Sequence, residues 1–125
     1  MESDHPTFGN GKICYLEIPC ENVDTSSSFY QHVFNWHVRK RSDGAVGFDD
    51  AVNEVSGSWV RDRKPSGDVG LLVHIMVDNA EETLKKIIAH GGSVVQEIGA
   101  DFPEITARFA DPFGNILGIY QHRSS

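Results

Sequence analysis

The sequence predicts an α+β fold made of two tandem βαβββ modules, and three observations lead to this expectation. At 125 residues the chain has the length of one domain and is long enough to bury a core. The order strand, helix, three strands occurs twice, with a period of about 57 residues. Aligning Cys20 with Val77 brings Glu17 to His74 without a gap, which indicates an internal duplication.

The first half opens with a strand over residues 11–20, whose side chains alternate between two faces. Asn22 or Asp24 then caps a helix that runs to residue 34 and carries an approximate apolar stripe. Three short strands are expected at residues 36–40, 45–49 and 53–60. We define module one as residues 11–60, which follow a tail of residues 1–10.

The second half repeats this order after a polar linker. The linker, residues 61–68, contains Pro65 and Gly67. In module two, residues 69–122, Asp78 or Asn79 caps an amphipathic helix that ends at a pair of glycines. Its strands are expected at residues 69–77, 93–98, 104–110 and 115–122.

The charge balance narrows the class of partner. The chain has 18 acidic and 11 basic residues, a formal net charge of −7, and its longest basic run is only three residues. This balance argues against nucleic acid and anionic membranes as partners. No stretch reaches the roughly 18 apolar residues of a membrane span, and the first ten residues lack the apolar segment of a secretory signal.

Cys14 and Cys20 are expected to be free thiols. If both lie on one strand, the rise per residue puts them about 20 Å apart, too far for a mutual disulfide. Free thiols are typical of a reducing compartment. Together with the missing signal segment, they predict a cytoplasmic protein.

Three segments of the chain stand out, namely EIP followed by FYQHVFNW, then VDNAEETLKKIIAHGG, and finally DPFGNILGIYQ. They resemble the vicinal-oxygen-chelate superfamily, which is also known as the glyoxalase, bleomycin resistance protein and extradiol dioxygenase superfamily. The resemblance covers residues 11–121 and suggests a glyoxalase-like, single-domain member. It implies a curled mixed sheet around a cleft, with the helices packed on the outside.

The resemblance also locates the metal ligands of the superfamily's metal-dependent members. They come from the first and last strands of each half, and here these positions fall on Tyr15, Leu72, Gly118 and Gly57. Leu72 and Gly118 have no ligating side-chain atom, and a tyrosine alone is a poor anchor for nickel, zinc or iron(II). We therefore expect no metal cofactor.

Strand alternation directs a set of side chains into the expected cleft. Tyr15 and Glu17 share one face, and the duplication places Leu72, His74 and Met76 on the equivalent face. Glu17 and His74 are then pseudo-symmetry mates, and a carboxylate with an imidazole in a partly apolar pocket can act as base and acid. The alternatives are an ion pair between Glu17 and a nearby arginine, and a satisfied core imidazole for His74.

Three further residues complete the predicted ligand site. Trp59 and Tyr120 fall at matching places on the closing strands of the two halves, where they offer flat apolar walls with polar tips. Arg108 offers a cation that can hold an anionic ligand. Core packing of the two aromatic residues and ion pairing of Arg108 are the alternatives.

Three functions remain open from the sequence. One is a metal-independent lyase or isomerase for a small oxygenated or aromatic metabolite, with Glu17 and His74 as acid and base. Another is a non-catalytic drug- or toxin-binding protein of the bleomycin-resistance type, which depends on Trp59 and Tyr120. The third is a metal-dependent lyase or dioxygenase in which Glu17 and His74 are relocated ligands.

The expected partners are a small-molecule ligand and a second copy of the chain. Exposed edge strands of an unclosed sheet favour association, so we expect a homodimer. Members of the superfamily close the cleft either within one chain or across a dimer. The sequence leaves both arrangements open.

Overall fold

The computed structural model describes residues 6–67 and 70–122 of the chain. They form two compact units, which divide between Arg63 and Lys64. Asp68 and Val69, where the expected linker ends and the next strand begins, lie outside the described residues. So do the first five residues of the expected tail.

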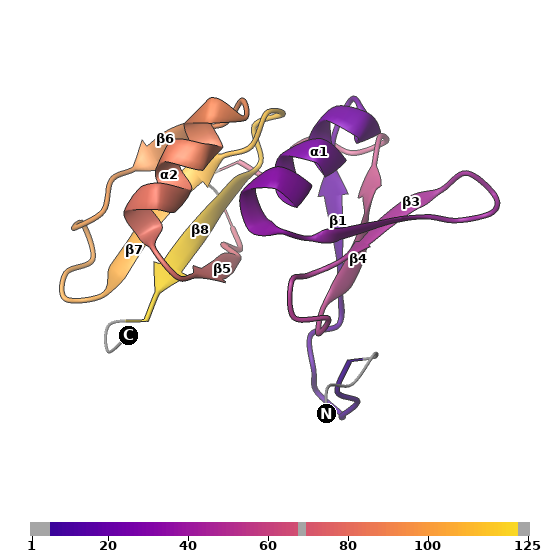
Figure 1. The fold of residues 1–125 in the computed structure, drawn as a ribbon, viewed down its shortest axis with the longest axis horizontal. Helices are drawn as coiled ribbons and strands as arrows, with labels where there is room; N and C mark the ends of the chain where they lie inside the picture. The colour runs from indigo at the N-terminus through magenta and orange to yellow at the C-terminus, as the bar shows by residue number, and fades with distance from the viewer. Residues whose placement is uncertain (1–5, 68–69, 123–125) are drawn as a thin grey trace. The chain divides into compact units, whose positions relative to one another are not determined.

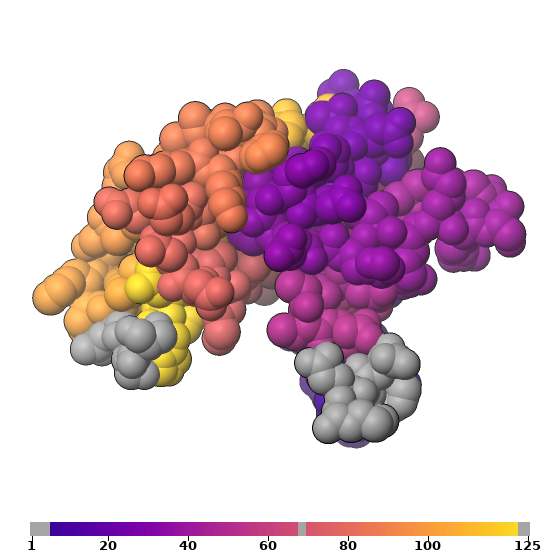
Figure 2. Space-filling view, viewed as in Figure 1, coloured from indigo at the N-terminus to yellow at the C-terminus, as the bar shows by residue number. Residues whose placement is uncertain are grey.

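The first unit is a βαβββ module whose helix covers one face of a four-stranded sheet (Figure 1). The strand order is β1-β4-β3-β2, in which β1 and β4 run parallel and the other neighbours run antiparallel. The elements are β1 (Tyr15–Pro19), α1 (Val23–Phe34), β2 (His37–Lys40), β3 (Val46–Asp49) and β4 (Ser56–Val60). Figure 2 shows the hairpin of β2 and β3 as a projection of this unit.

The second unit repeats the same topology. Its strand order is β5-β8-β7-β6, again with a parallel first pair and antiparallel neighbours. The elements are β5 (His74–Val77), α2 (Ala80–Ala89), β6 (Ser93–Gln96), β7 (Ile105–Ala110) and β8 (Ile116–Gln121). The α+β fold class and the two tandem βαβββ modules are thus confirmed. The first strand of this unit is shorter than expected, because it begins only at His74.

Asparagine begins both helices. The Asn22 side chain accepts a hydrogen bond from the Thr25 amide at 3.0 Å, and the Asn79 side chain accepts one from the Glu82 amide at 2.9 Å. Each asparagine has extended backbone angles and satisfies a donor that the first helical turn leaves open. Of the expected alternatives, the asparagine is therefore the cap in both modules.

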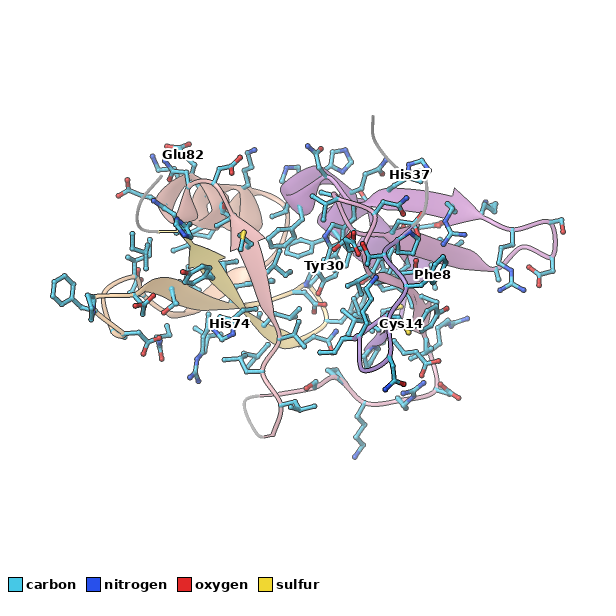
Figure 3. The ribbon with its side chains drawn as sticks, turned by 90° about the horizontal axis from the view of Figure 1, so that it is seen from below. Phe8, Cys14, Tyr30, His37, His74 and Glu82 are labelled. Carbon is cyan, nitrogen blue, oxygen red and sulfur yellow. The ribbon has the colours of Figure 1, made fainter. Side chains whose placement is uncertain are left out.

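An aromatic cluster fills the space between helix and sheet in the first unit. The rings of Tyr30 and Trp36 stack at 4.7 Å, and those of Trp36 and Phe48 stack at 4.5 Å. Trp59 meets Phe48 at 4.9 Å from the neighbouring strand. Tyr30 and Phe48 are fully buried, and Figure 3 shows Tyr30 inside the unit. Such rings remove large apolar areas from water, so this cluster is the core of the first unit.

Aliphatic packing and a buried polar turn stabilise the second unit. Its core is formed by fully buried side chains of helix and sheet, namely Ile87, Ala107, Phe109 and Ile119. Asp111, which is almost fully buried, accepts hydrogen bonds from the amides of Phe113 and Asn115. The Asn115 side chain accepts one from the Ser66 amide at 2.9 Å. This turn therefore fixes the segment that leads into the second unit.

Cys14 is exposed and Cys20 is buried, and both are free thiols, as expected. Within the described part of the chain, no helix is long and apolar enough to cross a membrane. A cytoplasmic location stays a prediction.

Gly57 is the position where the packing of the first unit has least room. A Cβ atom there would overlap the Leu16 carbonyl oxygen and the Phe48 ring. We expect Gly57→Ala to lower the free energy of unfolding by about 1–3 kcal/mol, because an added methyl group in a packed core forces neighbours to shift. Thermal or urea unfolding measures this loss. Gly67→Ala is the control, since no described residue other than its chain neighbours lies within 4 Å of its Cβ position, and equal stability of the two variants would contradict the expectation.

Candidate functional site

Each sheet has one face that its helix covers and one that it leaves uncovered, which we call the open face. Strand alternation puts Ile18, Phe48 and Trp59 under the helix of the first unit, where all three are buried. Cross-strand pairing then orders the open face into two rows. One row consists of Arg39, Gly47, Ser58 and Glu17, and the other of His37, Asp49, Ser56 and Tyr15.

A hydrogen-bonded network on this face centres on Asp49. Its carboxylate accepts hydrogen bonds from Arg39 Nε at 2.8 Å and Arg39 Nη2 at 3.0 Å. The Ser56 hydroxyl donates a third bond at 2.7 Å. The pKa of Asp49 is lowered, chiefly by the Arg39 bond and in part by Ser56, while desolvation opposes the shift. The pKa of Arg39 is raised, first by its bond to Asp49 and less by Coulombic attraction to Asp49 and Tyr15.

Glu17 forms an ion pair with Arg63, which follows β4 in the chain. The pair is solvent-accessible, with 43% of the Glu17 side chain and 53% of the Arg63 side chain exposed. Exposed pairs contribute little to stability, typically about 0.2–1 kcal/mol. Glu17 therefore forms the ion pair with an arginine that the sequence left open as an alternative. Its carboxylate is nevertheless exposed enough for a ligand to reach.

The open face of the second unit contains four of the predicted site residues. Cross-strand pairing forms one row of Gln96, Arg108, Gly118 and His74, and a second row of Thr106, Tyr120 and Met76. His74 is the first residue of β5 and is labelled in Figure 3. His74, Met76, Arg108 and Tyr120 thus share one surface, as strand alternation predicts. Leu72 precedes β5 and is partly buried.

The imidazole of His74 lies directly over Gly118. A Cβ atom at position 118 would approach His74 Cδ2 to 2.6 Å and Nε2 to 2.7 Å. Non-bonded atoms do not come this close to a Cβ atom, so the glycine is what makes room for the ring. The imidazole therefore occupies the space in which a side chain at position 118 would stand.

Neither His74 nor Arg108 has a side-chain partner among the described residues. Arg108 is partly buried and His74 is exposed. No hydrogen bond or ion pair joins either side chain to another residue in the ranges 6–67 and 70–122. The ion-pair alternative for Arg108 thus finds no acidic partner among the described residues. Both side chains keep their hydrogen-bonding groups available to a ligand.

The pairing register corrects two correspondences between the halves. Tyr120 pairs with Met76, as Val60 pairs with Pro19, so Trp59 corresponds to Ile119 and not to Tyr120. A shift of one residue moves a side chain to the other face of a strand. Trp59 accordingly points into the aromatic core and away from the open face, where a cleft wall was expected.

The same shift affects Gly57. His74 pairs with Gly118, and Glu17 pairs with Ser58, so Ser58 is the first-half counterpart of Gly118. Gly57 is buried on the helix side against Phe48. The last-strand ligand position of the first half therefore falls on Ser58 and not on Gly57.

Sequence reasoning missed the network of Arg39, Asp49 and Ser56. These residues come from three strands, and only the register of β2 on β3 and of β3 on β4 brings them together. Each strand has at most five residues. A basic residue and an acidic residue at same-parity positions of a hairpin are the only sequence signal of this pair.

Glu17 and His74 belong to different units, and each lies on the open face of its own sheet. They are at equivalent positions, because Glu17 pairs with Ser58 on β4 and His74 pairs with Gly118, the counterpart of Ser58, on β8. Their convergence in one cleft stays a prediction.

Several solved structures have the same fold as this chain. A fosfomycin resistance protein, FosX, from Listeria monocytogenes aligns with a TM-score of 0.74 and 14% identity, over 90% of this chain and 91% of that one. A glyoxalase/bleomycin resistance protein/dioxygenase family enzyme from Burkholderia phytofirmans gives 0.72 and 20%, over 86% and 95%. TnmS3, an antibiotic-binding protein from a Streptomyces species, gives 0.69 and 16%, over 92% and 98%.

A curated relative is also similar in sequence. The chain is 27% identical over 117 residues to a lactoylglutathione lyase of Neisseria meningitidis serogroup A, which covers 82% of this chain and 85% of that protein. These comparisons correct the expectation that the chain takes no cofactor, because lactoylglutathione lyase and FosX are metal-dependent members of the superfamily.

The usual metal-ligand positions were therefore compared with the donors that this chain offers. They hold Tyr15, Leu72, Ser58 and Gly118, two of which have no donor atom in the side chain. The described residues contain no group of three or more His, Cys, Asp or Glu side chains placed to hold a metal ion. The residues at these positions do not fit the superfamily's metal site, and no reaction step is derived through one.

A family-wide sequence comparison completes the assignment. The Glyoxalase/Bleomycin resistance protein/Dioxygenase superfamily matches residues 12–119, which include both βαβββ modules. The match therefore extends from the strand that carries Glu17 to the strand that carries Gly118. This chain belongs to the Glyoxalase/Bleomycin resistance protein/Dioxygenase superfamily.

Proposed function

We propose that this protein binds a small, oxygenated, anionic metabolite and acts on it as a lyase or isomerase, with His74 and Glu17 as proton-transfer groups. The observation that carries the proposal is the row in which Arg108 and His74 flank Gly118 without partners among the described residues. An oxygenated anion supplies the negative charge and the hydrogen-bond acceptors that neither side chain finds among the described residues.

Arg108 supports the anionic character of the ligand. A guanidinium group that is partly removed from water loses hydration, and proteins usually offset this loss with a carboxylate. Here none of the described residues provides that carboxylate. A ligand carboxylate or phosphonate is the group that the planar guanidinium binds best.

His74 supports proton transfer on the same ligand. An imidazole changes its charge near neutral pH and is the most common general acid or base in enzymes. Gly118 leaves no side chain beneath the ring. Neither ring nitrogen has a partner in the ranges 6–67 and 70–122. In the proposed reaction, His74 abstracts a proton from a carbon atom next to a carbonyl group of a ligand held by Arg108.

Glu17 is the proposed second proton-transfer group, on the open face of the first unit. Its carboxylate forms the exposed ion pair with Arg63. Tyr15, Leu72, Met76 and Tyr120 are the proposed ligand contacts. The similarity to a lactoylglutathione lyase makes S-lactoylglutathione the first compound to test.

Variants of the second unit test the catalytic proposal. We expect His74→Gln to lower kcat for S-lactoylglutathione by about 100-fold or more, because general acid–base catalysis contributes at least this factor. Arg108→Gln is expected to raise KM by about tenfold, because it removes a charge-assisted hydrogen bond. Steady-state kinetics of the purified full-length protein measures both.

The controls for this test are His32→Gln and Arg41→Gln, whose exposed side chains bond to Ser28 and Asp43. They should behave as wild type. Unchanged kcat in His74→Gln would contradict the proton-transfer role, and equal KM in Arg108→Gln and wild type would contradict the role of the guanidinium group.

A non-catalytic binding function is the alternative, and one observation favours it. Met76 is 71% exposed and pairs across the strands with Tyr120 on the open face. A flexible thioether beside an aromatic ring suits a planar apolar ligand. TnmS3, a protein of the same fold, is an antibiotic-binding protein.

Binding measurements separate this alternative from catalysis. For a protein that only binds its ligand, we expect Tyr120→Ala to weaken the affinity for an aromatic antibiotic by about tenfold, since stacking and area are lost together. Trp59→Phe should leave affinity unchanged, because Trp59 lies in the core. Calorimetric titration provides the values. Loss of affinity in the Trp59 variant alone would reverse this assignment.

We further propose a homodimer. The edge strands β1 and β2, and β5 and β6, each have one side without a strand neighbour in the described sheets. Unpaired strand edges and exposed apolar side chains such as Met76 favour association. Sedimentation equilibrium of the full chain is expected to give twice the monomer mass of 13.8 kDa. A single species with the monomer mass at micromolar concentration would contradict the proposal.

A further inference from the structure

The open face of the first unit holds a guanidinium group that the proposed reaction does not use. We propose that Arg39 binds a carboxylate group of a small ligand, and that Asp49 and Ser56 are positioning residues that hold the guanidinium group for it. The inference rests on the proposed function for the class of ligand, and it adds a binding residue on the other sheet.

The hydrogen-bond geometry leaves one side of Arg39 available. Asp49 takes the Nε–H group and one N–H of Nη2. A guanidinium group has five N–H donors, so three of them, including both on Nη1, have no partner among the described residues. The edge formed by Nη1 and Nη2 is again a fork of two parallel donors, which matches the two oxygens of a carboxylate.

Asp49 and Ser56 hold this fork in place. The Asp49 side chain is only 16% exposed, and its oxygens are shared between Arg39 and the Ser56 hydroxyl. A free arginine loses much rotational freedom when it binds a ligand, whereas a fixed one has already lost it in folding. The network therefore lowers the entropic cost of binding at Arg39.

The residues beside Arg39 in its row have small side chains. In its row, Gly47 and Ser58 follow, and they carry a hydrogen atom and a short hydroxymethyl group. Tyr15, which is 53% exposed and close enough to influence the pKa of Arg39, adds a hydroxyl group. A cation with small neighbours and a nearby hydroxyl group is suited to an oxygenated anion.

A second pair in the same hairpin shows what an ordinary surface ion pair looks like here. Arg41 and Asp43 are joined by a single contact of 3.3 Å, and their side chains are 65% and 60% exposed. The Arg39 pair has two shorter bonds, a mostly buried carboxylate and a third donor. Arg41→Gln is therefore a matched control for Arg39→Gln.

The test is an NMR titration of the full-length protein with pyruvate, and with hydroxyacetone as its uncharged analogue. We expect pyruvate to shift the Arg39 Nη–H resonances and hydroxyacetone to leave them unmoved. Arg39→Gln is expected to weaken the pyruvate affinity measured on the first unit by about tenfold, the usual effect of losing a charged hydrogen bond. Arg41→Gln should bind as wild type. An unmoved Arg39 resonance, or wild-type affinity in Arg39→Gln, overturns the proposal.

The positioning role has its own readout. Ser56→Ala is expected to weaken pyruvate binding about threefold, and Ser56→Thr to restore it, because threonine keeps the hydroxyl group. Equal loss in both variants at unchanged melting temperature overturns the positioning role. Thermal unfolding of every variant excludes a simple loss of fold.

The outcomes also separate this inference from the proposed function. If Arg108→Gln raises KM for S-lactoylglutathione while Arg39→Gln leaves pyruvate binding intact, only the inference fails. If pyruvate shifts Arg39 in a protein that neither binds nor converts S-lactoylglutathione, the inference stands and the catalytic proposal fails.

Discussion

The burial of one face of each sheet under its own helix is the constraint on which the rest of the structure depends. In the first unit an aromatic cluster around Tyr30 and Trp36 fills this interface, and in the second unit Ile87 and Phe109 do so. Once these side chains are buried, strand alternation sends every second residue to the open face. The chemistry of the protein is therefore limited to the residues that packing does not require.

Two glycines show how closely the faces are specified. Gly57 lies on the helix side and leaves room for the Phe48 ring, whereas Gly118 lies on the open face and leaves room for the His74 ring. Both are on the last strand of their module, and their roles are unrelated. One serves packing and the other serves the site, and the difference follows from a single step in strand register.

Much of the fold was predictable from periodicity alone. The repeated order of elements, the capped helices and the faces of β1 and β5 follow from local patterns, and so do the shared positions of His74 and Met76. The register of the last strands was not predictable, because short strands with small residues fit either parity. This is why Trp59 was expected in the site and lies in the core, and why the Arg39 network was missed.

The placement of His74 over Gly118 also bears on how the protein can change over time. Any side chain at position 118 would collide with the imidazole, since even a Cβ atom would come within 2.6 Å of the ring. A metal-ligating residue at position 118 therefore requires the exposed His74 ring to leave its present place. The imidazole in this rotamer and a ligand on the last strand of the second unit exclude one another.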